Sequence, residues 1–201
     1  MDKNGEVFAV DGNNWVVKSN ALIESKGKMT ALEQKLILSV ISEITPDDQV
    51  FGVYEVSLSE FQRHLGTATK HFYDEVQKAA TSLLRRVINV ESLENGKRKF
   101  LAMTYISSAE YVEGEGKIKI SFDPKMKPYL LELKSCFTQY QLKNIMTLKG
   151  SHSIRIYELL KQYENMRPRK RELEITELKK ILGIEKKYSV FADFEKRILI
   201  S

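Results

Sequence analysis

Long apolar runs are absent from this chain of 201 residues, and none approaches the roughly 18 apolar residues that a membrane-spanning helix requires. The N-terminus lacks the basic region and apolar core of a secretory signal, so we expect a cytoplasmic protein with no membrane partner. A single cysteine excludes an internal disulfide. Because Cys136 lies beside Phe137 in an apolar context, we expect a buried structural thiol.

Residues that carry catalytic chemistry are also scarce. The three histidines, His64, His71 and His152, are scattered, and no pair has the spacing of metal ligands. No Gly-rich loop ends in Lys-Ser or Lys-Thr to hold a nucleotide. The His-x-His metal site that rolling-circle initiators place beside a nicking tyrosine is missing as well. We therefore expect no enzyme activity, no catalytic residue, no metal site and no cofactor.

Charge of both signs is plentiful but unevenly distributed. The chain has 32 Lys and Arg against 27 Asp and Glu, a formal net charge of +5. From Lys161 to the end there are 11 basic and 7 acidic residues, so +4 of that charge lies in the C-terminal part. A basic face fits a polyanion such as nucleic acid, although clustered lysines are also common on plain solvated helices.

The length and the apolar pattern favour two small modules rather than one large core. Residues 1–14 are polar and rich in Gly and Asn, which indicates a disordered lead or a weakly held edge. The first helix is predicted to begin at Thr30, because Thr30 and Glu33 have the spacing of a capping box. A continuous apolar face follows and stops at Pro46.

A strand and two helices are predicted next. Residues 54–58 alternate as a short strand, and a short helix over 59–65 ends at Gly66. A longer helix over 69–85 has apolar residues at helical spacing. This order places a turn between two helices, as in a helix-turn-helix unit.

A β-hairpin is predicted after the longer helix. Its strands cover 87–90 and 100–106, and the Asn95-Gly96 pair suits the positive φ angles of a tight turn. Its tip is basic, and a further strand is predicted over 117–122. Helix, strand, short helix, longer helix and hairpin make a winged helix-turn-helix, in which we assign this hairpin as the wing.

The connecting region is predicted to be helical. A helical turn or two is expected over 128–133, and the spacing of Thr138 and Gln141 predicts a second capping box. After Gly150 a longer amphipathic helix covers 151–163. Its expected apolar stripe is Ile154, Ile156, Tyr157, Leu159, Leu160 and Tyr163, and the opposite face would carry Arg155 and Glu158 as a surface pair.

The C-terminal part repeats the first module. Residues 173–178 through Leu182-Gly183 match residues 56–61 through Leu65-Gly66 in type at an offset of 117, and the preceding helices correspond at an offset of 120. The last helix is predicted to begin near Ser189. It would bury Phe191, Phe194 and Ile198.

Several segments together resemble the bacterial plasmid replication initiators of the iteron-binding, theta-replication type. The resemblance covers almost the whole chain from about Trp15, and the order and spacing of its pieces make it specific. The segments that carry it are Val17-Lys18-Ser19-Asn20, Glu33 to Ile37, Phe137-Thr138-Gln139-Tyr140, Ser153 to Leu160, Leu182-Gly183 through Tyr188, Asp193-Phe194 and Lys196-Arg197.

The resemblance implies an α+β fold of tandem winged helix-turn-helix domains. We divide the chain into a disordered lead over 1–14, a first domain with connecting helices over 15–149 and a second domain over 150–201. The second is expected to be truncated before its wing, because the family continues there for several more elements. The implied partners are double-stranded DNA carrying origin repeats, the host initiator, the replicative helicase and a second copy in a homodimer that represses its own promoter.

Two sets of residues are the candidate DNA contacts, since Lys and Arg hold phosphates and a helix in the major groove reads bases. In the second module they are Lys186, Lys187, Ser189, Lys196 and Arg197, with Arg197 as the base reader. In the first module and its hairpin they are Lys70, His71, Lys78, Arg85, Arg86, Lys97, Arg98 and Lys99. A winged-helix transcriptional regulator without a replication role, or a protein-interaction module, stays open as an alternative.

Overall fold

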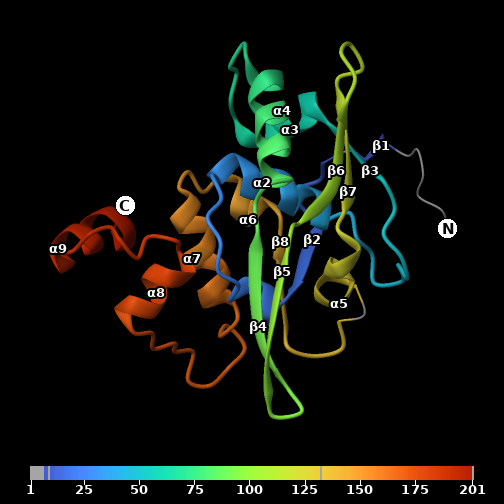
Figure 1. The fold of residues 1–201 in the computed structure, drawn as a ribbon. Coiled ribbons are helices and arrows are strands. Elements are labelled where there is room, and N and C mark those ends of the chain that lie inside the picture. Colours follow the sequence, from blue (N-terminus) through green and yellow to red (C-terminus); the bar gives the residue numbers. More distant parts are fainter. Residues whose placement is uncertain (1–6, 9, 132, 201) are drawn as a thin grey trace.

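The computed structural model describes residues 7–8, 10–131 and 133–200. Helices surround a small mixed sheet, and the C-terminal helices extend to one side (Figure 1). In chain order the elements are β1 (Val7–Phe8), β2 (Trp15–Ser19), α1 (Asn20–Ile23), α2 (Ala31–Ile41), β3 (Tyr54–Ser57), α3 (Leu58–Leu65), α4 (Phe72–Leu83), β4 (Ile88–Glu94), β5 (Lys97–Met103), β6 (Ile106–Tyr111), β7 (Lys117–Phe122), η1 (Pro124–Met126), α5 (Lys127–Leu130), β8 (Phe137–Gln141), α6 (Lys143–Met146), α7 (Ser151–Lys161), α8 (Ile175–Ile181), α9 (Phe191–Phe194) and η2 (Glu195–Leu199).

Helix α2 is the centre of the main core, and its predicted start is confirmed. The Thr30 hydroxyl accepts from the backbone N–H of Glu33, and the Glu33 carboxylate accepts from the backbone N–H of Thr30. These reciprocal bonds satisfy two donors that a helix start leaves open. Every residue from Glu33 to Ile41 is buried, because β2, β3, α4 and α7 all pack on this helix.

The predicted helix-turn-helix of the first module is also confirmed. Helix α3 ends at Gly66, whose φ of 62° and ψ of 31° are left-handed, the conformation that favours glycine at a helix end. Helix α4 then contributes Phe72, Val76 and Leu83 to the core. The rings of Phe61 and Phe72 lie 5.9 Å apart and join the two helices.

The hairpin that completes the winged-helix sheet is β6–β7, so our assignment of the wing to β4–β5 was wrong. The four-stranded sheet has the order β1-β3-β7-β6, and β7 pairs antiparallel with β3. Strands β4 and β5 form a separate two-stranded ribbon. The sequence pattern predicted one hairpin and a further strand over 117–122, and only the remote pairing of β7 with β3 identifies the wing. The true wing turn over 112–116 carries Glu113 and Glu115, and it is not basic.

Residues 137–141 form strand β8, which corrects the helix predicted from Thr138. The strand pairs antiparallel with β2 over the full length of both, from Trp15 opposite Gln141 to Ser19 opposite Phe137. The Thr138 hydroxyl donates to Asn20 Oδ1 at 2.7 Å and caps no helix. The helix that follows, α6, has four residues. Cys136, expected to be buried, is exposed with a φ of 53°.

The N-terminal segment is more ordered than a disordered lead. Val7–Phe8 pairs parallel with β3 at the edge of the sheet, and Val10 and Gly12 are buried. The backbone N–H of Lys143 donates to the carbonyl of Gly12 at 2.8 Å. The prediction for residues 1–6 and 9 lies outside the described residues.

Helix α7 begins at Ser151 as predicted, but it ends at Lys161, before the predicted end at 163, and it buries a different face. Leu160, expected in the apolar stripe, is 58 % exposed, whereas Arg155 and Glu158 are 5 % and 1 % exposed. Glu158 accepts from Lys18 at 2.7 Å and from the Tyr140 hydroxyl at 2.5 Å. The polar face is buried because cations from α7 itself and from β2 match its carboxylate.

The internal repeat has a clear structural counterpart. Helices α2 and α7 cover 31–41 and 151–161, an offset of 120, and α3 and α8 begin at Leu58 and Ile175, an offset of 117. Gly183 has a φ of 67°, as Gly66 has 62°. The two copies differ in packing: α7 also contacts α1, α2 and β8, so it belongs to the core of the first module as well.

The second module has a small core of its own. Leu182, Ile184, Phe194 and Ile198 are buried together, and Ile156 of α7 packs against them. Phe194 and Ile198 were predicted to be inward, whereas Phe191, predicted with them, is 51 % exposed. No strand occurs among residues 162–200, all of which the structure describes.

Candidate nucleic-acid interface

The turn after α8 presents the basic residues of the second module. Lys186, Lys187 and Ser189 are exposed between Gly183 and α9. Lys179 of α8 holds this turn in place. Its ammonium group donates to the carbonyl of Tyr188 at 2.6 Å and lies 5.4 Å from the centre of the Phe194 ring. The exposed side chains of Lys186, Lys187 and Ser189 therefore extend from a turn whose backbone is anchored by Lys179.

Lys196 and Arg197 lie on η2, a π-helical turn that continues α9. Phe194 and Ile198 flank them in the sequence and point into the small core, which leaves residues 195–197 exposed. Within the described residues no ion pair engages Lys186, Lys187, Lys196 or Arg197. Side chains of this kind are available for phosphates or base edges.

In the first module, Lys70, His71 and Lys78 are exposed at the start and on the outer face of α4. His71 is the N-cap residue of α4, and its Nδ1 lies 3.7 Å from Asp74 Oδ2. The acidic first turn, which contains Asp74 and Glu75, reduces the positive charge that this end of α4 offers to DNA.

The two arginines after α4 differ in their surroundings. Arg85 is exposed, whereas Arg86 is partly buried and donates through Nε and Nη2 to Glu33 Oε1 at 3.1 and 3.0 Å. Burial alone would raise the pKa of Glu33, but hydrogen bonds from Ser82, the Thr30 backbone and Arg86 lower it. Arg86 therefore already has an intramolecular partner at the start of α2.

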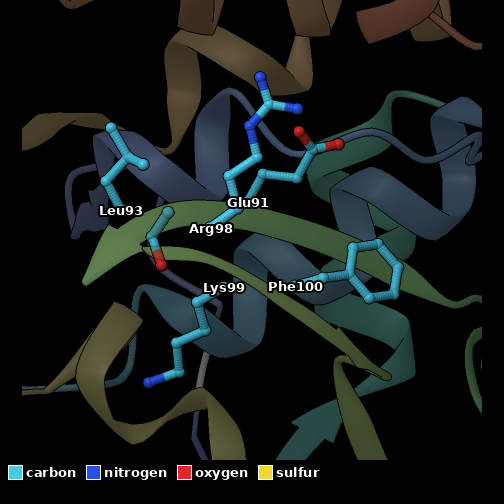
Figure 2. A pocket seen from close by; sticks show the side chains of 6 residues that line it. Glu91, Leu93, Arg98, Lys99 and Phe100 are labelled. Carbon is cyan, nitrogen blue, oxygen red and sulfur yellow. The ribbon is translucent and has the colours of Figure 1, made fainter. Parts of the chain in front are cut away.

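The β4–β5 ribbon carries Lys97, Arg98 and Lys99 together with acidic residues. Lys99 pairs with Glu94 at 2.8 Å. Figure 2 shows Arg98 and Glu91 extending from the same side of the ribbon and Lys99 from the other. These residues line a shallow hollow of about 580 Å³. The ribbon also exposes Leu93 and Phe100, so it is a mixed surface and not a purely basic one.

The candidates of the first module do not form one patch. The ribbon reaches one end of the molecule, whereas α3, α4 and the wing turn lie at the other (Figure 1). The turn after α8 and η2 lie to the side, in the second module. The structure thus separates the residues of the ribbon from those at the start of α4.

Lys28 is a basic residue that sequence reasoning missed. It is exposed in the loop before α2, and its Cβ lies 3.2 Å from the position that a Cβ would take on Gly183. No local pattern in the sequence indicates this contact, because the two residues are brought together only by the packing of the modules.

The described residues contain no group of three or more His, Cys, Asp and Glu that could hold a metal ion. None of the described helices is long and apolar enough to cross a membrane.

A helix-turn-helix beside a three-stranded antiparallel unit, followed by a second helix-turn-helix, defines a winged-helix protein. The family model described as "Initiator Replication protein, WH1" matches residues 15–161. The chain belongs to this family of replication initiators. The match runs from β2 to the end of α7.

Two solved structures are similar to this chain. The Pi initiator protein, solved in complex with iteron DNA, is 16 % identical with a TM-score of 0.73, and the match covers 94 % of this chain and 84 % of that one. The WH1 domain of MSBI1.176, a replication protein isolated from a multiple sclerosis patient, is 20 % identical over 59 % of this chain and 86 % of that one, with a TM-score of 0.42.

A curated relative is similar in sequence. It is an uncharacterized 27.6 kDa protein from Escherichia coli, 24 % identical over 136 residues, which are 67 % of this chain and 56 % of the relative. The chain thus spans a little over half the length of the curated relative that it matches. The predicted tandem winged-helix fold is confirmed by the family match together with the likeness to the Pi initiator protein.

Proposed function

We propose that this protein initiates plasmid replication by binding repeated double-stranded DNA sequences, or iterons, at an origin. The observation that carries the proposal is the family match to replication initiators over residues 15–161. The likeness of the fold, over 94 % of the chain, to an initiator solved with iteron DNA supports it further.

The second module would make the base contacts. Lys186, Lys187 and Lys196 would hold phosphates, with Ser189 as a further backbone contact, and Arg197 would donate two hydrogen bonds to guanine. These assignments are supported by the exposure of all five side chains, three on the turn after α8 that Lys179 holds and two on η2. The first module would contact the phosphate backbone of the DNA through residues of α4 or of the β4–β5 ribbon.

The remaining partners follow from the same proposal. The protein would act in the cytoplasm without catalysis or a cofactor, recruit the host initiator and the replicative helicase, and repress its own promoter as a homodimer. The ribbon, with exposed Leu93 and Phe100 and with charges of both signs, is a surface on which such protein contacts would be sought.

Binding of origin DNA tests the proposal. We expect the protein to prefer a duplex from its plasmid origin over a scrambled duplex of the same composition, measured by fluorescence anisotropy. The affinity should fall with salt, with a slope of about −0.9 for each phosphate contacted in a plot of log affinity against log salt concentration. Equal affinity for both duplexes would contradict iteron recognition, and no binding at low salt would favour a protein-interaction module.

Arg197→Ala tests the assignment of the base reader. Loss of a bidentate contact to guanine should cost about 1 to 3 kcal/mol on the specific duplex and little on the scrambled one. Lys196→Ala is the matched control, because the loss of a phosphate contact weakens both duplexes alike. If Arg197→Ala also weakens both equally, Arg197 is a phosphate contact.

A further inference from the structure

The loop before α2 and the turn after α8 meet at the contact between the two modules, which we call the seam. This contact brings together basic groups that are far apart in the sequence. Lys28 lies in the loop before α2, and Lys187 lies in the turn after α8. Gly183, which begins that turn, lies so close to Lys28 that an added Cβ would meet the Lys28 Cβ at 3.2 Å. The backbone of the turn therefore packs directly on the loop of the first module.

Helix α7 lines the same seam. Ile156 packs against the small core of Leu182, Ile184, Phe194 and Ile198, which holds the second module against α7. His152 lies one helical turn before Ile156, on the same face. Burial, and then the charges of Lys187 and Lys28, lower the pKa of His152.

The acidic residues of this region act on a different lysine. Glu177 and Glu185 act on Lys26, whose ammonium already donates to Glu91 at 2.9 Å. No carboxylate is among the groups that shift His152. Within the described residues no ion pair neutralises Lys28 or Lys187.

Like charges held together in a folded protein cost free energy unless an anion is shared between them. A flexible single module could spread such charges apart, but here they are placed by the packing of two modules. A polyanion that spans both modules satisfies this arrangement, and the phosphate backbone of duplex DNA has the required charge density.

We infer that Lys28 and Lys187, brought to one surface by the packing of Gly183 on the loop of Lys28, form a phosphate-binding seam that holds the backbone of duplex DNA across both modules. This inference rests on the proposed function, which already places Lys187 on a phosphate, and it adds Lys28 of the first module as a second contact beside that turn. Bound DNA would thereby fix the position of the second module on the first.

The test uses the salt dependence of binding to a duplex of arbitrary sequence, because phosphate contacts do not depend on sequence. Lys28→Ala and Lys187→Ala should each reduce the magnitude of the log–log salt slope by about 0.9, and the double variant by about twice that amount. Lys28→Arg should keep the wild-type slope. The control is Lys125→Ala, since Lys125 is exposed in η1, just before α5 on the side of the molecule away from the second module (Figure 1).

The outcomes separate the inference from the proposed function. Lys125→Ala is expected to keep the wild-type salt slope. If the wild-type protein binds the duplex and both seam variants also keep this salt slope, the seam holds no phosphate. If the wild-type protein binds no duplex even at low salt, the proposed function fails and the seam fails with it. Unchanged thermal unfolding of the seam variants would show that a reduced slope reflects lost contacts.

Discussion

At the scale of single residues, Glu158 is a buried charge with partners from several elements. It is 1 % exposed, and it receives hydrogen bonds from Lys18 and Tyr140. Arg155 Nη1 lies 3.7 Å from its second oxygen and Arg155 Nη2 donates to the carbonyl of Ser25 at 2.7 Å. The cluster ties α7 to β2, to β8 and to the segment after α1.

Glu158→Ala should destabilise the fold by about 3 to 5 kcal/mol, because it leaves Lys18 buried without a counter-ion. Urea unfolding followed by circular dichroism measures the change. The double variant Lys18→Met with Glu158→Leu should recover much of the loss, since it removes both charges. Glu164→Ala is the control, because the Glu164 pair with Lys161 is partly exposed and worth at most about 1 kcal/mol.

The same carboxylate gives a pH dependence. Burial alone would raise the pKa of Glu158, but the charges of Lys18 and Arg155 lower it below its ordinary value of 4.5. Its contribution to stability is therefore complete above pH 4.5 and is lost as pH falls toward the lower pKa of the folded state. The wild-type protein should lose more stability than Glu158→Gln below pH 4.5. Parallel losses would contradict a stabilised carboxylate.

Sequence periodicity could not predict this cluster. Arg155 and Glu158 have helical spacing and the residue types of a solvated surface pair, so the pattern places them outward. Their burial depends on Lys18 and Tyr140, which come from strands outside α7, and on a pairing of β2 with β8 that no local signal indicates. Thr30, Glu33 and Gly66 were predicted correctly because caps depend on neighbours within a few residues.

At the scale of elements, α7 connects the two modules through Leu159, whereas the next residue, Leu160, is exposed. Leu159 is 2 % exposed and packs with Ile23 of α1 and Ile181 of α8. Leu160 is 58 % exposed. Leu159 thus joins elements of both modules, whereas Leu160 faces solvent.

Leu159→Ala should cost about 2 to 5 kcal/mol, the range for buried leucines, and should loosen the contact between α1 and α8. Leu160→Ala should cost far less, because little apolar area returns to water. Thermal or urea unfolding of the two variants measures both values. A larger loss for Leu160→Ala would mean that α7 is rotated from the orientation described here.

The candidate site was only partly predictable at this scale. The turn after α8 was found from the repeat, since Gly183 and its flanking residues copy the pattern around Gly66. The wing was misassigned because only one hairpin was predicted from the sequence, and the identity of the wing depends on the pairing of β7 with β3. Lys28 was missed because its neighbour Gly183 is remote in the sequence.

At the scale of the whole molecule, an ion pair between Arg171 and Glu24 anchors the segment over 162–174 that connects the two modules. The Arg171 guanidinium donates to both oxygens of Glu24, at 2.5 and 2.8 Å, and Gln162 donates to the same carboxylate at 2.9 Å. The guanidinium also lies 5.2 Å from the centre of the Tyr163 ring. Residues 164–170 between these contacts are all exposed. This ion pair therefore anchors a connecting segment that is otherwise largely exposed.

Arg171→Ala should increase hydrogen exchange across residues 162–174 while the core of the first module around α2 stays protected. The reason is local: the segment loses its bidentate bond and its ring contact, whereas α2 is buried by other elements. Lys170→Ala is the matched control, because Lys170 is exposed and pairs only with the neighbouring Glu172 among the described residues. Arg171→Lys should restore protection only in part, since an ammonium cannot make the planar two-point contact. If Arg171→Ala and Lys170→Ala give the same exchange, the connection is held by other contacts, such as the packing of Leu159 with Ile23 and Ile181.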